Sequence, residues 1–180
     1  GYNVHGLDLL EDLDITTCLL DYKVDLVIHL AGKSGVRESI NDPSAYWMNN
    51  VEGTKRIFNA FSKKTRILYA SSSSAYEPAL NPYAASKFII DQIAPKNSVG
   101  MRFHTVYSNK PRAGMFLDKL INGTLEYVTD HSRDFIHIED LCDAIELIME
   151  HKELNGLIDI GTGESIKIHT LAPSLPKRLN

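Results

Sequence analysis

Runs of apolar residues along this chain alternate with segments in which apolar side chains recur every three or four positions. The clearest run is residues 24–32, a near-continuous apolar stretch typical of a parallel strand that is covered on both faces. Further runs of this kind predict strands at 66–70, 99–107 and 157–161, with shorter extended pieces at 2–8, 13–15 and 133–137.

Helical spacing fills the intervals between these strands. Pro43 begins a segment whose apolar stripe predicts a helix over 43–62, with the stripe facing the core or a subunit interface. Asn81 and Pro82 suit the cap and the first residue of a second helix, over 82–93. The pattern also predicts a helix ending at Tyr22, helices at 115–122 and 139–150, and loops at 33–42 and 108–114.

This alternation determines the expected fold class. Strands that alternate with helices predict a parallel, doubly wound sheet, which is a three-layer α/β domain. A chain of 180 residues is long enough to bury a real core in such a domain. The sequence contains no internal repeat and no low-complexity segment.

Composition narrows the functional class. The net charge of −4 and the pI of about 6.0, with no basic run, argue against a protein that binds nucleic acid or a membrane surface. Neither a signal peptide nor a long apolar span is visible, so we expect a cytoplasmic protein. Cys18 and Cys142 lie in apolar helical contexts without metal-ligand spacing, so buried thiols are favoured over a disulfide and no metal site is expected.

The segment 81–91 contains a candidate acid/base pair. Tyr83 and Lys87 are four residues apart on the predicted helix and therefore share one face. A free tyrosine titrates near about 10, so a proton acceptor at neutral pH needs a shift of roughly three units, about 4 kcal/mol. A neighbouring ammonium favours the phenolate and supplies part of that shift. By itself the pair is also compatible with a solvated helix edge.

Polar residues follow three predicted strands at the end where an open parallel sheet binds ligands. Asp8 follows the first strand, and an acid in that position can hold an adenosine ribose, although a plain turn aspartate fits equally well. Ala31 and Gly32 leave room for a flat ligand to approach the backbone. A cluster of four serines, 71–74, follows the strand at 66–70, where a simple loop is the alternative.

Taken together, these stretches resemble the extended short-chain dehydrogenase/reductase superfamily, in particular its NAD-dependent nucleotide-sugar epimerases and dehydratases. The matching pieces occur in family order along most of the chain, at 29–32 (HLAG), 50–54 (NVEGT), 71–76 (SSSSAY), 83–87 (YAASK), 102–107 (RFHTVY) and 133–140 (RDFIHIED).

The resemblance implies a role for each matching residue. Tyr83 would be the acid/base on a sugar hydroxyl, Lys87 would lower its pKa and hold the nicotinamide ribose, and Ser72 would hydrogen-bond the same hydroxyl. The positions that match NAD contacts are Asp8, Asp14, Ile15, Ala31, Gly32, Asn50 and Lys87, and those that match substrate contacts are Ser73, Arg112 and Arg133, with Arg133 on the substrate diphosphate.

The resemblance also implies a domain division and a partner. Residues 1–107 would form the NAD-binding Rossmann-like domain, and 108–180 a small, reduced substrate-binding region in which 134–160 packs back on the sheet. The 43–62 and 82–93 helices would pair across a two-fold axis, which predicts a homodimer.

Within the family, the residues after Ser72 favour one reaction. Members that eliminate water carry an acidic pair there, because dehydration needs a second acid and base, whereas this chain has Ser73 and Ser74. A 4-epimerase of UDP-sugars or UDP-uronic acids is therefore favoured over a 4,6-dehydratase. Asp8 disfavours a reductase that uses NADPH, because its carboxylate would repel a 2′-phosphate.

The sequence also departs from the family pattern. Residues 1–12 contain no glycine-rich turn for the NAD pyrophosphate, and only eleven positions separate Ser72 from Tyr83. Either these residues are part of a longer enzyme, or the chain is a pared-down version that binds NAD weakly or not at all. A non-catalytic module that binds a nucleotide sugar is the rival hypothesis, and the intact Ser72, Tyr83 and Lys87 argue against it.

Overall fold

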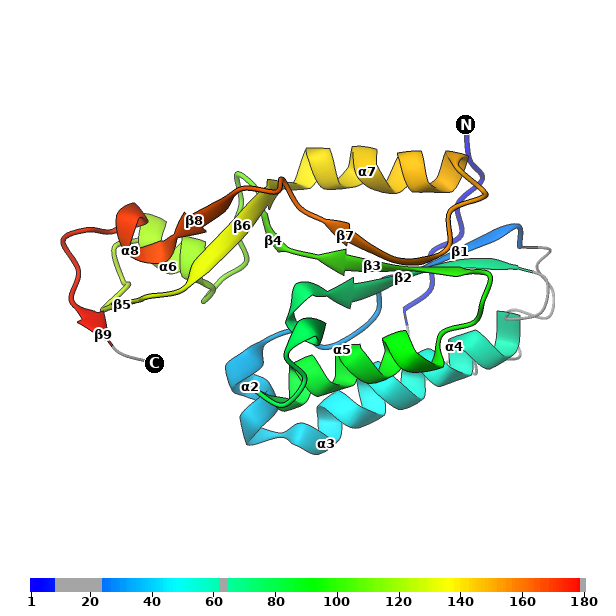
Figure 1. Ribbon diagram of the computed structural model, residues 1–180, viewed down its shortest axis with the longest axis horizontal. Coiled ribbons are helices and arrows are strands. Elements are labelled where there is room, and N and C mark those ends of the chain that lie inside the picture. The colour runs from blue at the N-terminus through cyan, green and yellow to red at the C-terminus, as the bar shows by residue number, and fades with distance from the viewer. Residues whose placement is uncertain (9–23, 62–64, 179–180) are drawn as a thin grey trace. The chain divides into compact units, whose positions relative to one another are not determined.

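The computed structural model describes residues 1–8, 24–61 and 65–178 (Figure 1). The chain divides into two compact units. The first contains Gly1–Arg102 and Leu154–Ile158, and the second contains Phe103–Glu153 and Asp159–Asn180. Each unit is described by itself.

A parallel central sheet confirms the predicted α/β class. Its strand order is β1-β2-β3-β7, with bounds Leu26–His29, Arg66–Ser72, Ser98–Phe103 and Gly156–Ile160. Strand β1 pairs in parallel with β2, from Leu26 opposite Arg66 to His29 opposite Tyr69. Because successive right-handed crossovers in one direction place their helices on one face, the connecting helices of β1-β2 and β2-β3 lie together (Figure 1).

Those helices match the two predicted from the sequence, and a π-helix within the first of them was not predicted. The predicted 43–62 helix is a continuous helical run made of α3 (Pro43–Tyr46), a π-helix η1 (Trp47–Glu52) and α4 (Gly53–Phe61). The predicted 82–93 helix is α5 (Pro82–Ile93), and the Asn81 side chain accepts a hydrogen bond from Ala84 N at 2.8 Å, as its cap position predicts. A short 3-10 helix, η2 (Ser73–Tyr76), follows β2.

The core of the first unit lies between this helical layer and the sheet. Val51, Phe58, Ile67, Tyr69 and Ile90 form one buried cluster, in which the Phe58 and Tyr69 rings meet edge to face at 5.2 Å between centroids. The predicted stripe on the 43–62 helix therefore faces the core from Val51 onward.

The second unit contains smaller elements. Strand β4 (Thr105–Tyr107) pairs in parallel with β6 (Ser132–His137), which pairs antiparallel with β8 (Ser165–Lys167). The other elements are β5 (Val128–Thr129), β9 (Lys177–Arg178), α6 (Phe116–Ile121), α7 (Ile138–Glu150) and α8 (Ile168–Leu171). Val128, Ile168 and Ala172 form its buried cluster.

Several predicted boundaries were wrong. The predicted loop at 33–42 contains α2 (Val36–Asn41), a helix of six residues that is too short to show a clear apolar stripe. The predicted strand 99–107 breaks at His104, whose backbone N–H donates to Ile160 O at 3.1 Å, and β4 belongs to another sheet. Residues 2–8 are exposed and form no strand, and 13–15 lies outside the described residues.

The predicted thiol environment was also wrong where the structure describes it. Cys142 is free and exposed, because it lies outside the face of α7 that Leu141 and Ile148 bury, and Cys18 lies outside the described residues. Within the described ranges, no helix combines the length and apolar character needed to cross a membrane. The same ranges contain no group of three or more His, Cys, Asp or Glu residues that could hold a metal ion.

Candidate functional site

The predicted catalytic residues meet where β1 and β2 end. Ser72 is the last residue of β2, Gly32 follows β1, and α5 carries Tyr83 and Lys87 across these strand ends. The Lys87 ammonium donates a hydrogen bond to Ala70 O at 2.7 Å. The same nitrogen lies 3.6 Å from the position that a Cβ on Gly32 would occupy, so the ammonium lies close to the ends of both strands.

Tyr83 has the contacts of an acid/base group. Its phenol is hydrogen-bonded to the Ser72 side chain, and the Lys87 nitrogen lies 6.0 Å from the centroid of its ring. Burial raises the pKa of Tyr83, and the hydrogen bond with Ser72 acts in the opposite direction. The phenol is therefore protonated in this structure at neutral pH, and it needs additional positive charge to act as a base.

Lys87 is buried but has hydrogen-bonding capacity left. Burial lowers its pKa to about 8, and the nearby negative charge of Asp91 opposes that change. The ammonium has three N–H donors, and among the described residues only Ala70 O accepts one. Two donors therefore remain for a ligand beside Gly32.

Asn50 holds the loop that follows β1. Its carboxamide oxygen accepts from Lys33 N at 2.7 Å, and its amide nitrogen donates to Lys33 O and to Ser86 Oγ, both at 3.0 Å. Asn50 lies in the π-helix η1, a type of turn that frequently marks functional sites. The side chain, 1% exposed, ties the Gly32–Lys33 loop to the helix of Tyr83. A direct NAD contact by Asn50 stays a prediction.

Sequence patterns did not reveal the buried histidine at the end of β1. His29 Nε2 lies 2.8 Å from Thr54 Oγ1, and burial, together with the positive charge of Lys87, lowers the pKa of His29 to about 4. The imidazole is therefore neutral at pH 7. It fixes Thr54 on α4 without adding a second charge beside the ammonium.

This neutral histidine predicts a loss of stability in acid. The folded pKa of about 4 lies below the ordinary 6.5, so the unfolded chain binds the extra proton first and stability falls as pH drops from about 6.5 to 4. We expect His29 to account for about 3 kcal/mol of the loss. Urea unfolding of the parent protein and of His29→Asn at several pH values measures this loss of stability. An equal pH dependence in both proteins would contradict the prediction.

The remaining predicted site residues are dispersed. Ala31 and Ser73 adjoin Gly32 and Ser72 in the chain, Asp8 is exposed, and Asp14 and Ile15 lie outside the described residues. Arg112 and Arg133 are exposed in the second unit, on the loop before α6 and on β6. Asp134, beside Arg133, accepts hydrogen bonds from Thr162 N at 2.9 Å and Gly163 N at 2.8 Å, which anchors the 161–163 loop to β6.

The environment of Lys87 fits a cofactor ribose. Two ammonium donors are available, Gly32 presents no side chain, and the hydroxyl of Ser71 is buried without a hydrogen-bond partner among the described residues. A buried polar atom without a partner is rare in a folded protein unless a ligand or water satisfies it. The residues present therefore suit a hydroxylated ligand at the ends of β1 and β2.

Comparison with known proteins assigns the family. A model of the NAD dependent epimerase/dehydratase family matches residues 1–161. The chain belongs to this family. Members of the family depend on NAD, and the match confirms the resemblance drawn from the six sequence segments.

Individual relatives show how much of a longer protein this chain covers. UDP-glucose 4-epimerase from Mycoplasma genitalium is 27% identical, over 100% of this chain and 69% of its own length. ADP-L-glycero-D-manno-heptose-6-epimerase from Brachyspira hyodysenteriae is 28% identical, over 89% of this chain and 61% of its own length. The structure of MoeE5 in complex with UDP-glucose and NAD has a TM-score of 0.77 and 28% identity, over 95% of this chain and 70% of MoeE5. The chain thus spans about two thirds of these relatives.

Proposed function

We propose that this chain belongs to an NAD-dependent nucleotide-sugar epimerase, which inverts C4 of a UDP-sugar or UDP-uronic acid through a transient 4-keto sugar. One observation carries the proposal. The Tyr83 phenol is hydrogen-bonded to Ser72, and the buried ammonium of Lys87 lies 6.0 Å from its ring. This arrangement can move a proton to and from a sugar hydroxyl.

Each residue has a chemical task in this proposal. Tyr83 takes the proton of the sugar O4 hydroxyl as C4 is oxidised and returns it when the ketone is reduced, while Ser72 hydrogen-bonds the same oxygen. The Lys87 charge stabilises the phenolate, and its free N–H groups bind the ribose of the cofactor. NAD bound beside Lys87 and Gly32 would supply the hydride acceptor for C4 and the hydride donor for the opposite face of the ketone.

The proposed cofactor site combines residues from three segments. Ala31, Gly32 and Asn50 would line the nicotinamide end with Lys87, and Asp8 would bind the adenosine ribose. A carboxylate at that place favours NAD over NADPH. Asp14 and Ile15 remain proposed contacts from the resemblance alone.

Epimerisation is favoured over dehydration by the residues beside Ser72. Ser73 and Ser74 in η2 cannot supply the second acid and base that elimination of water requires, although Ser73 can hydrogen-bond the sugar. Arg112 and Arg133 would bind the diphosphate of the nucleotide. Structures of MoeE5 with UDP-glucose and with UDP-glucuronic acid support both sugar classes as candidates.

The proposal is tested by incubating the protein and NAD with UDP-glucose, UDP-galactose and their uronic acids, each deuterated at C4. We expect interconversion of one epimer pair with the deuterium retained at C4, because the hydride leaves and returns within the same complex. Loss of water, detected by mass spectrometry, would instead identify a dehydratase. Nucleotide-sugar binding without cofactor or turnover would identify a binding module and refute the enzyme.

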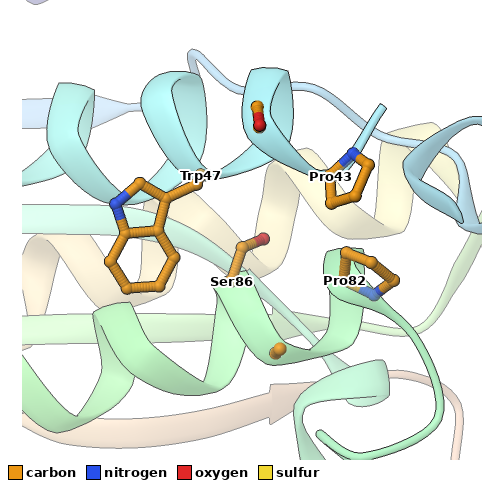
Figure 2. Close-up of a pocket in the computed structure, with 6 residues that line it drawn as sticks. Pro43, Trp47, Pro82 and Ser86 are labelled. Carbon is orange, nitrogen blue, oxygen red and sulfur yellow. The ribbon is translucent and has the colours of Figure 1, made fainter. Parts of the chain in front are cut away.

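We also propose a homodimer formed by the helical layer of the first unit. Trp47 and Met48 on η1 and Ile93 on α5 are 46%, 57% and 42% exposed, so this layer presents large apolar side chains that a second copy could cover. A pocket of about 260 Å³ lies between α5 and the run formed by α3 and η1 (Figure 2), and it is lined by Pro43, Ser44, Trp47, Pro82, Ala85 and Ser86. A second copy would cover this layer with its own equivalent residues across a two-fold axis.

Substitution of Trp47 tests the dimer. We expect Trp47→Glu to weaken self-association by at least about 30-fold, roughly 2 kcal/mol, because an aromatic anchor is replaced by a charge. Sedimentation equilibrium measures the change. Leu147→Glu, at a 57% exposed position on α7, is the control and should leave association unchanged. A monomeric parent protein, or equal effects of both variants, would contradict the prediction.

A further inference from the structure

A buried acid lies one helical turn after Lys87. Asp91 follows Tyr83 and Lys87 at the same four-residue spacing on α5, and its side chain is 0% exposed. Arg102 Nε donates to one carboxylate oxygen at 2.9 Å, and the Tyr69 hydroxyl donates to the other at 3.1 Å. Both oxygens are thus fixed by groups on strands β3 and β2, and the acid cannot swing away from the helix face that it shares with Lys87.

The same network reaches the turn that carries Ser72. The Arg102 guanidinium lies over the ring of Tyr76, 4.4 Å from its centroid. Tyr76 ends η2, which begins directly after Ser72, and Ser72 Oγ accepts a hydrogen bond from Ser74 N at 3.2 Å. Arg102 therefore connects Asp91 on α5 to the turn that places the serine hydroxyl.

Asp91 is also the group that opposes the cost of burying Lys87. The groups around the ammonium are Ala70 O on β2, the Gly32 backbone, the neutral His29 on β1, and Tyr83 and Asp91 on α5. Among the residues that the structure describes around the ammonium, only Asp91 brings a negative charge, and that charge raises the pKa of Lys87 against the larger effect of burial.

We propose that Asp91 is a positioning residue of this site, whose fixed carboxylate keeps Lys87 charged and, through Arg102 and Tyr76, holds the Ser72 turn against the helix of Tyr83. The catalytic consequence rests on the proposed function. The effect on the charge of Lys87 does not, so the two can be tested separately.

The charge is tested by the pH dependence of unfolding, without sugar or cofactor. In the folded protein Lys87 loses its proton at about 8, whereas an unfolded lysine holds it to about 10.5, so stability should rise with pH above 8. Subtracting the curve of Lys87→Met isolates this contribution from other groups that titrate between pH 6 and 10. In Asp91→Asn, we expect the rise to begin about one pH unit lower, because the charge that favours the ammonium is gone.

Two further variants separate charge from packing. Tyr69→Phe removes one hydrogen bond to Asp91 but keeps the charge of Asp91. The protein should be less stable, but its stability should begin to rise at the same pH as in the parent protein. Arg102→Gln keeps the carboxylate of Asp91 and removes its positive partner, so the increase of stability with pH should begin at a higher pH than in the parent protein. If Asp91→Asn does not fold, this variant tests the proposal. An unchanged onset in Asp91→Asn, or a shift in the same direction in Arg102→Gln, would overturn the proposal.

The catalytic arm uses the same variants. Turnover should fall at alkaline pH, and the midpoint of that fall should lie about one pH unit lower in Asp91→Asn than in the parent protein. In Tyr69→Phe the midpoint should be unchanged. Absence of turnover in the parent protein would refute the proposed function and leave the unfolding experiment as the test of Asp91. A parent enzyme that is active but whose alkaline limb is the same in Asp91→Asn would overturn the role of Asp91 alone.

Discussion

Tyr83→Phe is expected to lower the rate of sugar epimerisation by about 10³-fold while the protein remains folded. The substitution removes only the phenolic oxygen, which is hydrogen-bonded to Ser72 and is the proposed proton carrier. Loss of a general acid/base typically lowers rates by about 10² to 10⁴. Steady-state turnover with the deuterated sugars, together with thermal unfolding of the same sample, measures both parts of the expectation.

A neighbouring tyrosine provides the matched control. Tyr46 meets the Tyr83 ring edge to face at 6.3 Å between centroids, and its hydroxyl donates to Ser34 O at 2.9 Å. Tyr46→Phe removes a hydroxyl from the same environment without removing the proton carrier, so turnover should stay within a few-fold of the parent rate. If Tyr83→Phe retained more than about a tenth of the parent rate, another group would have to carry the proton.

Asn50→Ala is expected to have the largest effect on stability. The substitution removes three hydrogen bonds, one from Lys33 N, one to Lys33 O and one to Ser86 Oγ, while Ser86 Oγ keeps its bond to Tyr83 O at 2.7 Å. A hydrogen bond contributes about 0.5–1.5 kcal/mol net, so the loss of three should lower the free energy of unfolding by about 3 kcal/mol. Urea unfolding at constant pH measures the loss.

An exposed asparagine in the same unit provides a control for the loss of stability that any Asn→Ala substitution causes. Asn97 Nδ2 donates to Thr65 O at 2.8 Å at the surface, where water can replace the bond. Asn97→Ala should therefore cost less than about 1 kcal/mol. NAD binding should weaken in Asn50→Ala alone, because only that variant frees the Gly32–Lys33 loop. Equal losses in both variants would contradict the role assigned to Asn50.

Local sequence patterns predicted the elements that build the site because their signals are short-range. The Asn81 cap and Pro82 fixed the start of α5, and the apolar run at 24–32 located β1. A long strand predicted over 99–107 was wrong at His104, because an apolar run continues while the chain changes sheets. The helix α2 was missed because six residues carry too little periodic pattern.

The network around Lys87 was not predicted because it depends on distant contacts. His29 and Thr54 are 25 positions apart, and Asn50 and Ser86 are 36 apart, so no window of the sequence shows their hydrogen bonds. Asp91 carried one usable signal, since it continues the four-residue spacing of Tyr83 and Lys87. Its partners Tyr69 and Arg102 on two strands gave no such signal.

The sequence by itself determined the α/β class, the family and the order of Ser72, Tyr83 and Lys87 along the chain, because these follow from periodicity and from short motifs. Only the tertiary structure decided that Lys87 is buried, that His29 is neutral and that Asp91 is held by two strands. Burial and charge depend on which side chains surround a group in three dimensions, and that environment is assembled from segments far apart in the chain.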